Sequence, residues 1–566
     1  MTYFVTLEGE TYEDAVDAFS WDLPEEFNAA VDLVGKHDGD RVALHQAFPD
    51  GRRESYSFSD LDRRSNAVAN VLEQRGVEFG DRVAVVLSQK PANVLTHLAC
   101  WKVGAVSLPL SVLFGTDALR YRLTDSEARV AVVDAAQWET IREIAPDCPE
   151  LEDVLVVDAD AELDPDALEG ATASRFDAAV DREDVDYEVA STDVDTPAII
   201  MYTSGSTGEP KGVVHSHGVW LGHCPAFSMY FEREVRADDA VYWTPADWAW
   251  IGALGDLVFP AWHYGRPVVG SPMGSFDPEA ALELAAEFDV THTFLPPTAI
   301  RMLMDVDDPA DRYELSLRVI CSGGEPLTPE ILEWADAELE GTVVNELYGQ
   351  TEANLLVTNC REWFPARAGS MGKPVPGRDI ALVDPETGER VEAGSVGEIA
   401  VRRGEDPVVF DRYWNAPERT ERATLERGGD EQRSAEQSVS DGEAWHLTGD
   451  LAERDAEGYL WFKSRDDDLI ITSGYRVGPR EVEDAVLEHP SVAQVGVVGV
   501  PDDRRGEIIK AVVQPAAGTE GSEALREEIR ELVRDRLAEY EYPREIEFRE
   551  ALPQTTTGKI RRSELE

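Results

Sequence analysis

The sequence predicts an α/β protein with a large N-terminal domain and a small α+β domain near the C-terminus. Short apolar runs such as 83–87 and 130–133 alternate with helix-like stretches such as 59–74 and 90–104. That alternation is typical of βα units that build a largely parallel sheet. From residue 465 the pattern restarts in a compact form, so we expect an N-terminal domain over 1–464 and a mobile C-terminal domain over 465–566.

The remaining segments extend this pattern along the chain. The acidic stretch 158–195 is weakly patterned and is interpreted as surface elaboration, and the insertion 426–443, almost free of apolar residues, as a solvated loop. Further buried strands are expected in the first domain at 196–201, 267–269, 291–295 and 319–322. In the second domain we expect helices at 481–489 and 522–539, and strands at 492–500, 508–514 and 546–548.

The charge balance is strongly acidic. The 566 residues include 112 acidic and 52 basic side chains, for a formal net charge of −60. Such a surface repels nucleic acid and anionic lipid, so neither is an expected partner. Lysine occurs only at positions 36, 90, 102, 211, 373, 463, 510 and 559. We interpret this composition as adaptation to molar salt, as in an extreme halophile, where a Debye length of ~3 Å screens self-repulsion. The alternative is an acidic protein of dilute cytosol.

The cysteines and the N-terminus indicate the compartment. Five cysteines are scattered without a CxxC pair or metal-ligand spacing, which argues against a disulfide framework and a structural metal. Residues 1–28 lack a basic segment followed by an apolar one, and no apolar run approaches the ~18 residues of a membrane span. We therefore expect a cytoplasmic protein without a membrane span.

A loop rich in glycine and hydroxyl groups is the clearest candidate site. It runs from Tyr202 to Gly212, follows a predicted strand and contains Lys211. Glycines let backbone N–H groups approach an anion, hydroxyls add donors, and lysine adds a charge. The spacing differs from a Walker P-loop, and a flexible turn is the alternative. The predicted phosphate-binding residues are Thr203, Ser204, Gly205, Ser206, Thr207, Gly208 and Lys211.

With further motifs in the same order, the chain resembles the acyl-adenylate-forming enzymes, specifically AMP-forming acyl-CoA synthetases of the medium-chain type. The motifs beyond the loop lie at 322–327, 346–352, 448–450, 464–467, 473–483 and 557–559. The resemblance spans nearly the whole chain. It implies that a carboxylic acid and ATP form an acyl-adenylate and pyrophosphate, and that coenzyme A then takes the acyl group and releases AMP.

The resemblance implies a role for each motif in binding ATP. Gly323, Gly324 and Glu325 would lie along the adenine, and Asp450 and Arg465 would bind the ribose. Thr351 would reach the α-phosphate, and Glu352 would be an oxygen ligand for Mg²⁺. From the residues alone, Asp450 is also compatible with a local Asx turn, and Glu352 with a helix cap. The same motif assigns further ATP contacts to Glu346, Tyr348, Gly349 and Gln350.

The C-terminal motifs imply a two-step use of the small domain. Lys559, which by itself resembles a frayed tail residue, would lie between the acid and the α-phosphate and stabilise the charge that develops there. The domain would then rotate about a hinge at Asp467 to open a path for the thiol of coenzyme A. The implied coenzyme A contacts are Ser473, Gly474, Tyr475 and Arg476, with Arg505 and the segment 540–542 as weaker candidates.

The acyl pocket is predicted from two positions. Relatives that use acetate carry a tryptophan where this chain has Gly349, and loss of an indole makes room for several methylenes, each worth ~0.8 kcal/mol when buried. Trp250 is the implied acyl contact, whereas Trp248 is assigned to the core. We therefore expect an acid larger than acetate, of medium or short branched chain. Linear, branched and aromatic acids stay open, because one methylene discriminates by only ~1–3 kcal/mol.

Two departures and two alternative functions remain. Ser464 and Asn354 stand where the family commonly has glycine. One alternative is an enzyme of the same chemistry that passes the acyl group to a carrier protein, or a luciferase-like oxidase. The other is a non-catalytic nucleotide-sensing binder, which would be expected to lack Lys559 or Glu352. The sequence carries no prediction of the oligomeric state.

Overall fold

The computed structural model describes residues 4–159, 164, 168–203, 209–324, 327–385, 387–404, 406–425, 444–465, 468, 470–472, 475–502, 506–537, 541–554 and 560–565. The chain divides into two compact units. Unit 1 contains the described residues up to 380 with those of 401–427 and 442–446, and unit 2 those of 381–400 and 447–566.

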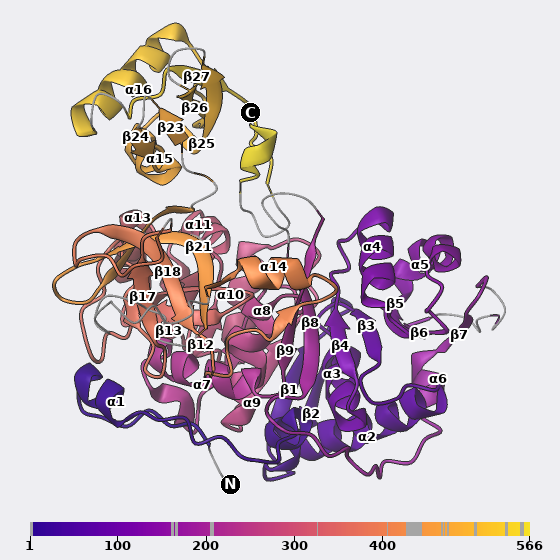
Figure 1. Ribbon diagram of the computed structural model, residues 1–566. Helices are drawn as coiled ribbons and strands as arrows, with labels where there is room; N and C mark the ends of the chain where they lie inside the picture. Colours follow the sequence, from indigo (N-terminus) through magenta and orange to yellow (C-terminus); the bar gives the residue numbers. More distant parts are fainter. Residues whose placement is uncertain are drawn as a thin grey trace, which may run out of the picture. The chain divides into compact units, whose positions relative to one another are not determined.

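The first sheet of unit 1 has the strand order β19-β9-β8-β4-β3-β5-β6-β7, and its strands from β8 to β7 are parallel. Its strands are β3 (Arg82–Val86), β4 (Val106–Pro109), β5 (Val130–Asp134), β6 (Asp153–Val157), β7 (Thr172–Arg175), β8 (Pro197–Thr203), β9 (Lys211–Ser216) and β19 (Arg412–Tyr413). Helices α4 (Thr116–Ser126) and α5 (Trp138–Ile144) cover one face, and α2 (Phe58–Gln74), α3 (Pro91–Val103) and α6 (Phe176–Val180) the other (Figure 1).

Local sequence explains why the helices of this layer begin and end where they do. Ser57 and Asp60 form a capping box at the start of α2. Helix α3 has Pro91 in its first turn and ends at Gly104, whose φ of 82° lies in the left-handed region that favours glycine. Residues that alternate along β3, β5 and β6 point to opposite faces, so both faces are apolar. The predicted helices 59–74 and 90–104 are confirmed.

The second sheet of unit 1 has the order β16-β15-β14-β13-β12-β10-β11-β1-β2 and is parallel from β14 to β1. Its strands are β1 (Val42–Ala47), β2 (Arg53–Ser57), β10 (Tyr242–Trp243), β11 (Val268–Gly270), β12 (His292–Phe294), β13 (Val319–Gly323), β14 (Val343–Gln350), β15 (Asn354–Thr358) and β16 (Lys373–Pro374). One face packs against α10 (Pro278–Glu287), α11 (Pro297–Met304) and α13 (Pro329–Glu338). Helices α7 (Val219–Tyr230) and α9 (Phe259–His263) belong to the aromatic layer on the other face.

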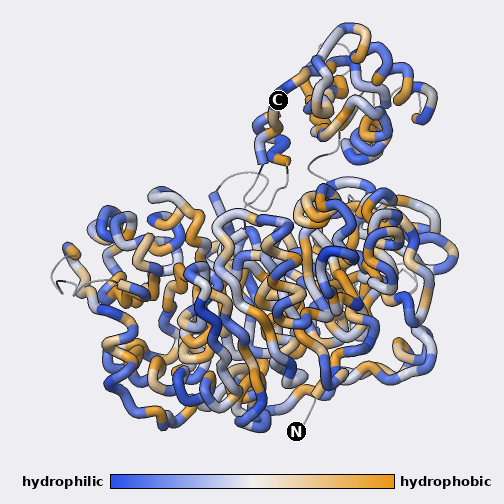
Figure 2. Tube along the Cα trace, turned by 180° about the vertical axis from the view of Figure 1, so that it is seen from behind, coloured by the Kyte–Doolittle hydropathy of each residue, from blue (hydrophilic) through white to orange (hydrophobic). Residues whose placement is uncertain are grey.

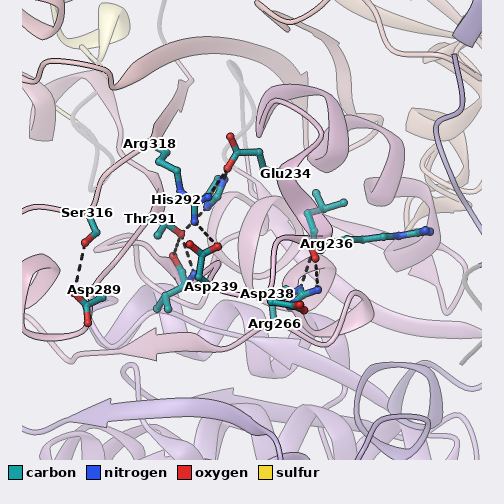
Figure 3. A network of polar contacts seen from close by, with 12 residues as sticks. Glu234, Arg236, Asp238, Asp239, Arg266, Asp289, Thr291, His292, Ser316 and Arg318 are labelled. Atoms are coloured by element: carbon teal, nitrogen blue, oxygen red, sulfur yellow. Dashed lines mark hydrogen bonds and ion pairs between the residues drawn. The ribbon is translucent and has the colours of Figure 1, made fainter. Parts of the chain in front are cut away.

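A polar network joins segments at the amino ends of these parallel strands (Figure 3). The Arg318 guanidinium lies 2.8 Å from Glu234 and 3.0 Å from Asp239. The hydroxyl of Thr291, just before β12, accepts from the Val241 amide at 2.9 Å. The network therefore occupies the end of the sheet opposite to the carboxyl ends of the strands.

One prediction for unit 1 is wrong in part. The stretch 158–195 was expected to be surface elaboration, but it contributes strand β7 and helix α6. Strand β7 pairs with β6, and Ala173 and Phe176 are buried. The few apolar residues of β7 and α6 contact the core on one side only, so the hydrophobic periodicity of this stretch is weak. The other acidic insertion, 426–443, lies outside the described residues.

Unit 2 contains a sheet of order β24-β23-β26-β25, with β27 beside β26. Its elements are β23 (Ile470–Thr472), β24 (Tyr475–Val477), α15 (Pro479–Leu487), β25 (Val492–Asp502), β26 (Gly506–Pro515), α16 (Glu523–Arg536) and β27 (Glu545–Phe548). Both helices pack on one face through an apolar core. The expected helices and strands of the C-terminal domain are confirmed, with their ends shifted by a few residues.

A further sheet was not predicted. Its order is β17-β18-β21-β20, with β22 beside β21, and its strands are β17 (Ile380–Val383), β18 (Val396–Arg402), β20 (Thr424–Leu425), β21 (Trp445–Arg454) and β22 (Leu460–Arg465). The shorter helices are α1 (Tyr12–Ala18), α8 (Ile251–Ala253), α12 (Pro309–Arg312) and α14 (Pro417–Arg422).

Hydrophilic residues follow the outer helices and loops of the chain (Figure 2). In the described ranges, no helix combines the length and the hydropathy that a membrane span needs.

Candidate functional site

The predicted site residues of unit 1 lie at or near the carboxyl ends of parallel strands. Strand β8 ends at Thr203, β13 at Gly323 and β14 at Gln350. In open α/β sheets, ligands bind beyond these ends. Thr203 pairs with Lys211 across the β8–β9 hairpin, so the two ends of the glycine- and hydroxyl-rich loop lie side by side. Ser204 to Gly208, and Glu325 in the second motif, lie outside the described residues.

The motif that is predicted to border the adenine follows β13 directly. Gly323 pairs with Leu347 of β14, and a Cβ on Gly323 would lie 2.7 Å from the Leu347 carbonyl oxygen. Gly324 has φ of 91°, which a side chain would strain. The Glu346 carboxylate accepts from the Leu327 amide at 3.2 Å. Gly323 therefore permits the close approach of β13 and β14, Gly324 permits a left-handed backbone conformation after β13, and Glu346 holds the Leu327 amide.

Histidines from two other segments hold the motif that runs from Gln350 to Glu352. His215 Nε2 lies 2.6 Å from the Thr351 carbonyl oxygen. Burial lowers the pKa of His215 to about 4, so the imidazole is neutral at pH 7 and donates through Nε2–H. His446 Nε2 lies 2.9 Å from Oε1 of Gln350, and burial lowers its pKa to about 3. An uncharged imidazole thus holds the Thr351 backbone, and a second one holds the Gln350 side chain.

The Glu352 carboxylate is held by a tyrosine. The Tyr413 hydroxyl donates to Oε1 at 2.7 Å, and the Phe410 amide donates to the Glu352 backbone oxygen at 2.8 Å. Among the described residues, Oε2 has no hydrogen-bond donor. No helix begins at Glu352, because the turn leads into strand β15, so the helix-cap alternative is wrong. Lys211 Nζ lies 5.1 Å from the centroid of the Tyr413 ring, which brings the loop lysine and this carboxylate to one tyrosine.

Glu352 fits a role as one of few protein ligands of Mg²⁺. The residue is 9% exposed, and its carboxylate offers a hard oxygen that no described donor occupies. In the described part of the chain, no group of three or more His, Cys, Asp or Glu side chains could hold a metal. Mg²⁺ in nucleotide sites keeps waters and phosphate oxygens and takes only one or two carboxylates. The donor set therefore suits a cation that arrives with the triphosphate.

Unit 2 brings the two predicted ribose residues together. Asp450 of β21 pairs with Arg465 of β22, and Nε of Arg465 lies 4.0 Å from Oδ1 of Asp450. The Thr448 hydroxyl accepts from the Asp450 amide at 3.2 Å. The threonine hydroxyl therefore takes the Asp450 amide at this turn.

The predicted acyl wall is aromatic. Trp250 stands edge-on to Phe114, with 5.9 Å between ring centroids, and is partly exposed. Trp248 is fully buried, as expected of a core residue.

Gly349 has a structural reason to be glycine that the sequence did not suggest. A Cβ there would lie 1.9 Å from the Asn354 carbonyl oxygen, beside the bulge between β14 and β15. Asn354 itself has φ of 42°. Asparagine tolerates this left-handed region better than other side chains, which explains why it can replace the family's glycine.

The C-terminal candidates are described only in part. Tyr475 and Arg476 form strand β24. Of the weaker candidates, Glu541 and Tyr542 are described. The Tyr542 hydroxyl accepts from Arg544 at 2.6 Å, and the guanidinium of Arg534 lies 4.2 Å from the Tyr542 ring centroid. The predicted hinge Asp467, the coenzyme A residues Ser473, Gly474 and Arg505, Tyr540 and the adenylation lysine Lys559 lie outside the described residues.

Sequence reasoning missed His215, Tyr413 and His446. His215 is a polar residue within the buried run of β9, which is the one feature that could have drawn notice to it. Tyr413 and His446 lie in strands too short or too polar for a periodic pattern.

Comparison with known proteins places these features in a family. Residues 32–414 match the model described as AMP-binding enzyme, and residues 481–559 match AMP-binding enzyme C-terminal domain. The chain is 35% identical to acetyl-coenzyme A synthetase of Bacillus subtilis, over 98% of this chain and 94% of the relative. It is also 35% identical to the mitochondrial acyl-coenzyme A synthetase ACSM4 of Rattus norvegicus, over 98% and 92%.

Solved structures agree. The Brucella canis acyl-CoA synthetase superposes with a TM-score of 0.71 at 33% identity, over 98% of both chains. The anthranilate CoA ligase AuaEII in complex with anthranoyl-AMP superposes with a TM-score of 0.81 at 28% identity, over 96% of this chain and 97% of that chain.

Proposed function

The chain belongs to the AMP-binding enzyme family and is an AMP-forming acid–CoA ligase, and we propose that its acid is larger than acetate, of medium or short branched chain. The first half-reaction joins the acid to AMP and releases pyrophosphate, and the second transfers the acyl group to coenzyme A and releases AMP. The observation that supports the residue assignments is that Lys211 and Glu352 both contact Tyr413, with Thr351 next to Glu352 in the same turn.

In the proposed first step, a carboxylate oxygen attacks the α-phosphorus of ATP and pyrophosphate leaves. Thr351 donates to the α-phosphate, and the loop 203–208 with Lys211 binds the β- and γ-phosphates. Gly323, Gly324 and Glu325 border the adenine, with Glu346, Tyr348, Gly349 and Gln350 on the adjacent strand, and Asp450 and Arg465 bind the ribose. Glu352 would hold Mg²⁺, which when bound neutralises phosphate charge. Lys559 neutralises the approaching anions and the charge that builds on the phosphoryl oxygens.

In the proposed second step, the thiol of coenzyme A attacks the acyl carbon, a thioester forms, and AMP leaves with the bonding electron pair. Residues 473–476 would line the thiol path, with Arg505 toward the nucleotide of coenzyme A. One small domain cannot present Lys559 and this path to the same acyl group at once. The domain over 465–566 therefore turns about Asp467 between the steps, since hinges are loop positions that absorb large φ/ψ changes.

The size of the acid rests on Gly349 and Trp250. By the resemblance, Gly349 replaces the indole of acetate-using relatives. Since a Cβ at 349 would meet the Asn354 carbonyl oxygen at 1.9 Å, no side chain from this position narrows the pocket, and Trp250 with Phe114 provides an apolar wall. The relatives' names include both acetyl- and acyl-coenzyme A synthetases, so the acid must be measured directly. A role in fatty acid metabolism follows if the acid is a medium-chain one.

The proposed environment is a reducing cytoplasm with molar salt. The five cysteines are free thiols and buried, which suits a reducing compartment. A net charge of −60 is tolerated best where salt screens it.

The test is an assay in molar KCl with ATP, Mg²⁺, coenzyme A and acids from acetate to decanoate, with 2-methylbutyrate and benzoate. AMP and thioester are measured by mass spectrometry. Thioester from acids of four or more carbons, with little from acetate, is the expected result. Efficient use of acetate would contradict the proposed acid size. Acyl-adenylate without thioester would instead favour a carrier protein as acceptor, and no turnover of any acid would favour a nucleotide sensor.

A further inference from the structure

Tyr413 lies between two side chains, one that the proposed function assigns to Mg²⁺ and one that it assigns to the ATP phosphates. Its hydroxyl donates to Glu352 Oε1 at 2.7 Å, and its ring faces Lys211 Nζ at 5.1 Å from the centroid. The residue is 5% exposed. One buried phenol thus contacts the carboxylate assigned to Mg²⁺ and the ammonium assigned to phosphate.

The backbone fixes the position of this ring from two sides. In the β19–β9 pair, Tyr413 lies opposite Val213, and the Trp414 amide donates to the Gly212 oxygen at 2.7 Å. On the other side, the Phe410 amide donates to the Glu352 oxygen at 2.8 Å. The segment 410–414 therefore ties the strand that leaves the phosphate loop to the turn that carries Glu352.

The two contacts have a clear electrostatic effect. A phenol that donates to an ionised carboxylate forms a charge-assisted hydrogen bond, which orients the carboxylate. The negative face of the ring attracts the ammonium. A direct ion pair between the ammonium and the carboxylate would partly neutralise each of them before ATP arrives. The phenol gives each charged group a partner without neutralising it. Oε2 of Glu352 stays available to Mg²⁺, and Lys211 keeps its charge for the phosphates.

We propose that Tyr413 is a positioning residue of the adenylation site, which orients the Glu352 carboxylate for Mg²⁺ and keeps the Lys211 ammonium available for the nucleotide phosphates. This inference rests on the proposed roles of Glu352 and Lys211. It adds a residue that lies in neither the loop nor the motif 346–352, and that contacts ligands only through its neighbours.

The test uses the full-length chain with Tyr413→Phe, which removes the hydroxyl and keeps the ring. Two quantities are measured: the Mg²⁺ concentration that gives half-maximal pyrophosphate release, and the rise in melting temperature caused by ATP with Mg²⁺ or with EDTA. Loss of an outer partner of a metal ligand typically weakens metal binding ~10–100-fold, so we expect the half-saturating Mg²⁺ to rise at least ~10-fold. The melting shift with Mg²⁺ and ATP should fall, while the shift with metal-free ATP should persist because the ring still contacts Lys211.

Two further variants make the result specific. Tyr56→Phe is the matched control, because its phenol also donates to a carboxylate, that of Glu54, on strand β2; its Mg²⁺ dependence should equal that of the parent. Tyr413→Leu removes the ring as well. We expect it to weaken the binding of metal-free ATP, because Lys211 would then pair with Glu352.

The outcomes separate the inference from the function. If Glu352→Gln inactivates the enzyme but Tyr413→Phe leaves the Mg²⁺ dependence unchanged, the inference is overturned and the proposed function stands. An equal loss of both ATP shifts in Tyr413→Phe also overturns it, because that is the pattern of a general packing defect. Failure of the parent to release pyrophosphate with any acid would instead remove the proposed function.

Discussion

The imidazole of His215 on strand β9 donates to the backbone carbonyl of Thr351 at 2.6 Å. The imidazole is buried and neutral, because burial lowers the pKa of His215 to about 4. The two segments that we propose to bind phosphate, the loop before β9 and the turn at Thr351, are therefore coupled through one hydrogen bond.

Replacing this donor should harm both stability and catalysis. His215→Phe leaves the Thr351 carbonyl without its partner, which costs ~1–3 kcal/mol of stability. A displaced Thr351 that loses ~1–3 kcal/mol of transition-state stabilisation would lower kcat/KM ~5- to 150-fold. Steady-state kinetics with varied ATP measures the effect. His215→Gln, which can still donate, should recover part of the loss. The partly exposed His45, changed to Phe, is the control; a loss of similar size there would contradict a specific role.

Buried histidines should make the fold sensitive to mild acid. Burial lowers the pKa of His97 to about 3, from 6.5, and both ring nitrogens lack a described partner. Because the folded state holds the lower pKa, the unfolded state binds the proton first. Stability is complete above pH 6.5 and is lost as pH falls toward 3, by up to ~1.4 kcal/mol per pH unit for each such histidine. Melting temperatures between pH 7.5 and 4.5 should fall less steeply in His97→Leu than in the parent, and equal slopes would contradict the assignment.

The Arg378–Asp406 pair should behave as a buried ion pair. Nη1 of Arg378 lies 2.7 Å from Oδ1 of Asp406, and neither side chain is more than 7% exposed. Removing one partner leaves an unpaired buried charge, so Asp406→Ala should cost ~3–5 kcal/mol. Thermal unfolding measures this. The double variant Arg378→Leu with Asp406→Ala should be more stable than Asp406→Ala. If the two single effects simply add, the pair is not coupled.

Gly349 should tolerate no side chain. A Cβ would lie 1.9 Å from the Asn354 carbonyl oxygen, far inside contact distance, so the strands must separate. We expect Gly349→Ala to lower the melting temperature and to reduce turnover of every acid alike, since the bulge beside Gln350 shifts. Gly274→Ala, where a Cβ meets no atom within 4 Å, is the control. Selective loss of longer acids in Gly349→Ala would mean that the methyl group enters the acyl pocket.

Lys559→Ala should separate the two half-reactions. The lysine is proposed to act on the phosphoryl charge, so acid-dependent pyrophosphate release should fall strongly. Thioester formation from supplied acyl-adenylate and coenzyme A should persist, and stopped assays of each half-reaction measure the difference. Equal losses in both would contradict the assignment.

Much of the fold could be predicted because many of its elements have a clear hydrophobic periodicity in the local sequence. The run 83–87 and the helix 59–74 repeat with the periods of a buried strand and of a helix, and the C-terminal elements do the same. Strand β7 and the strands β17 to β22 were not predicted, because short or half-polar strands show no hydrophobic periodicity. Hydrogen bonding to neighbouring strands determines their conformation.

The candidate site divides in the same way. The sequence by itself determined which chemical groups are present. These are a loop of glycines and hydroxyls with a rare lysine, and a Gln-Thr-Glu segment that, with the other motifs in order, resembles one family. Only the tertiary structure decided which groups touch. Tyr413 meets Glu352 across 61 positions of chain, and His215 meets Thr351 across 136. Such contacts follow from the pairing of β19 with β9 and from close packing of sheet edges, and these depend on the whole fold, because no local propensity encodes the distance between residues remote in sequence.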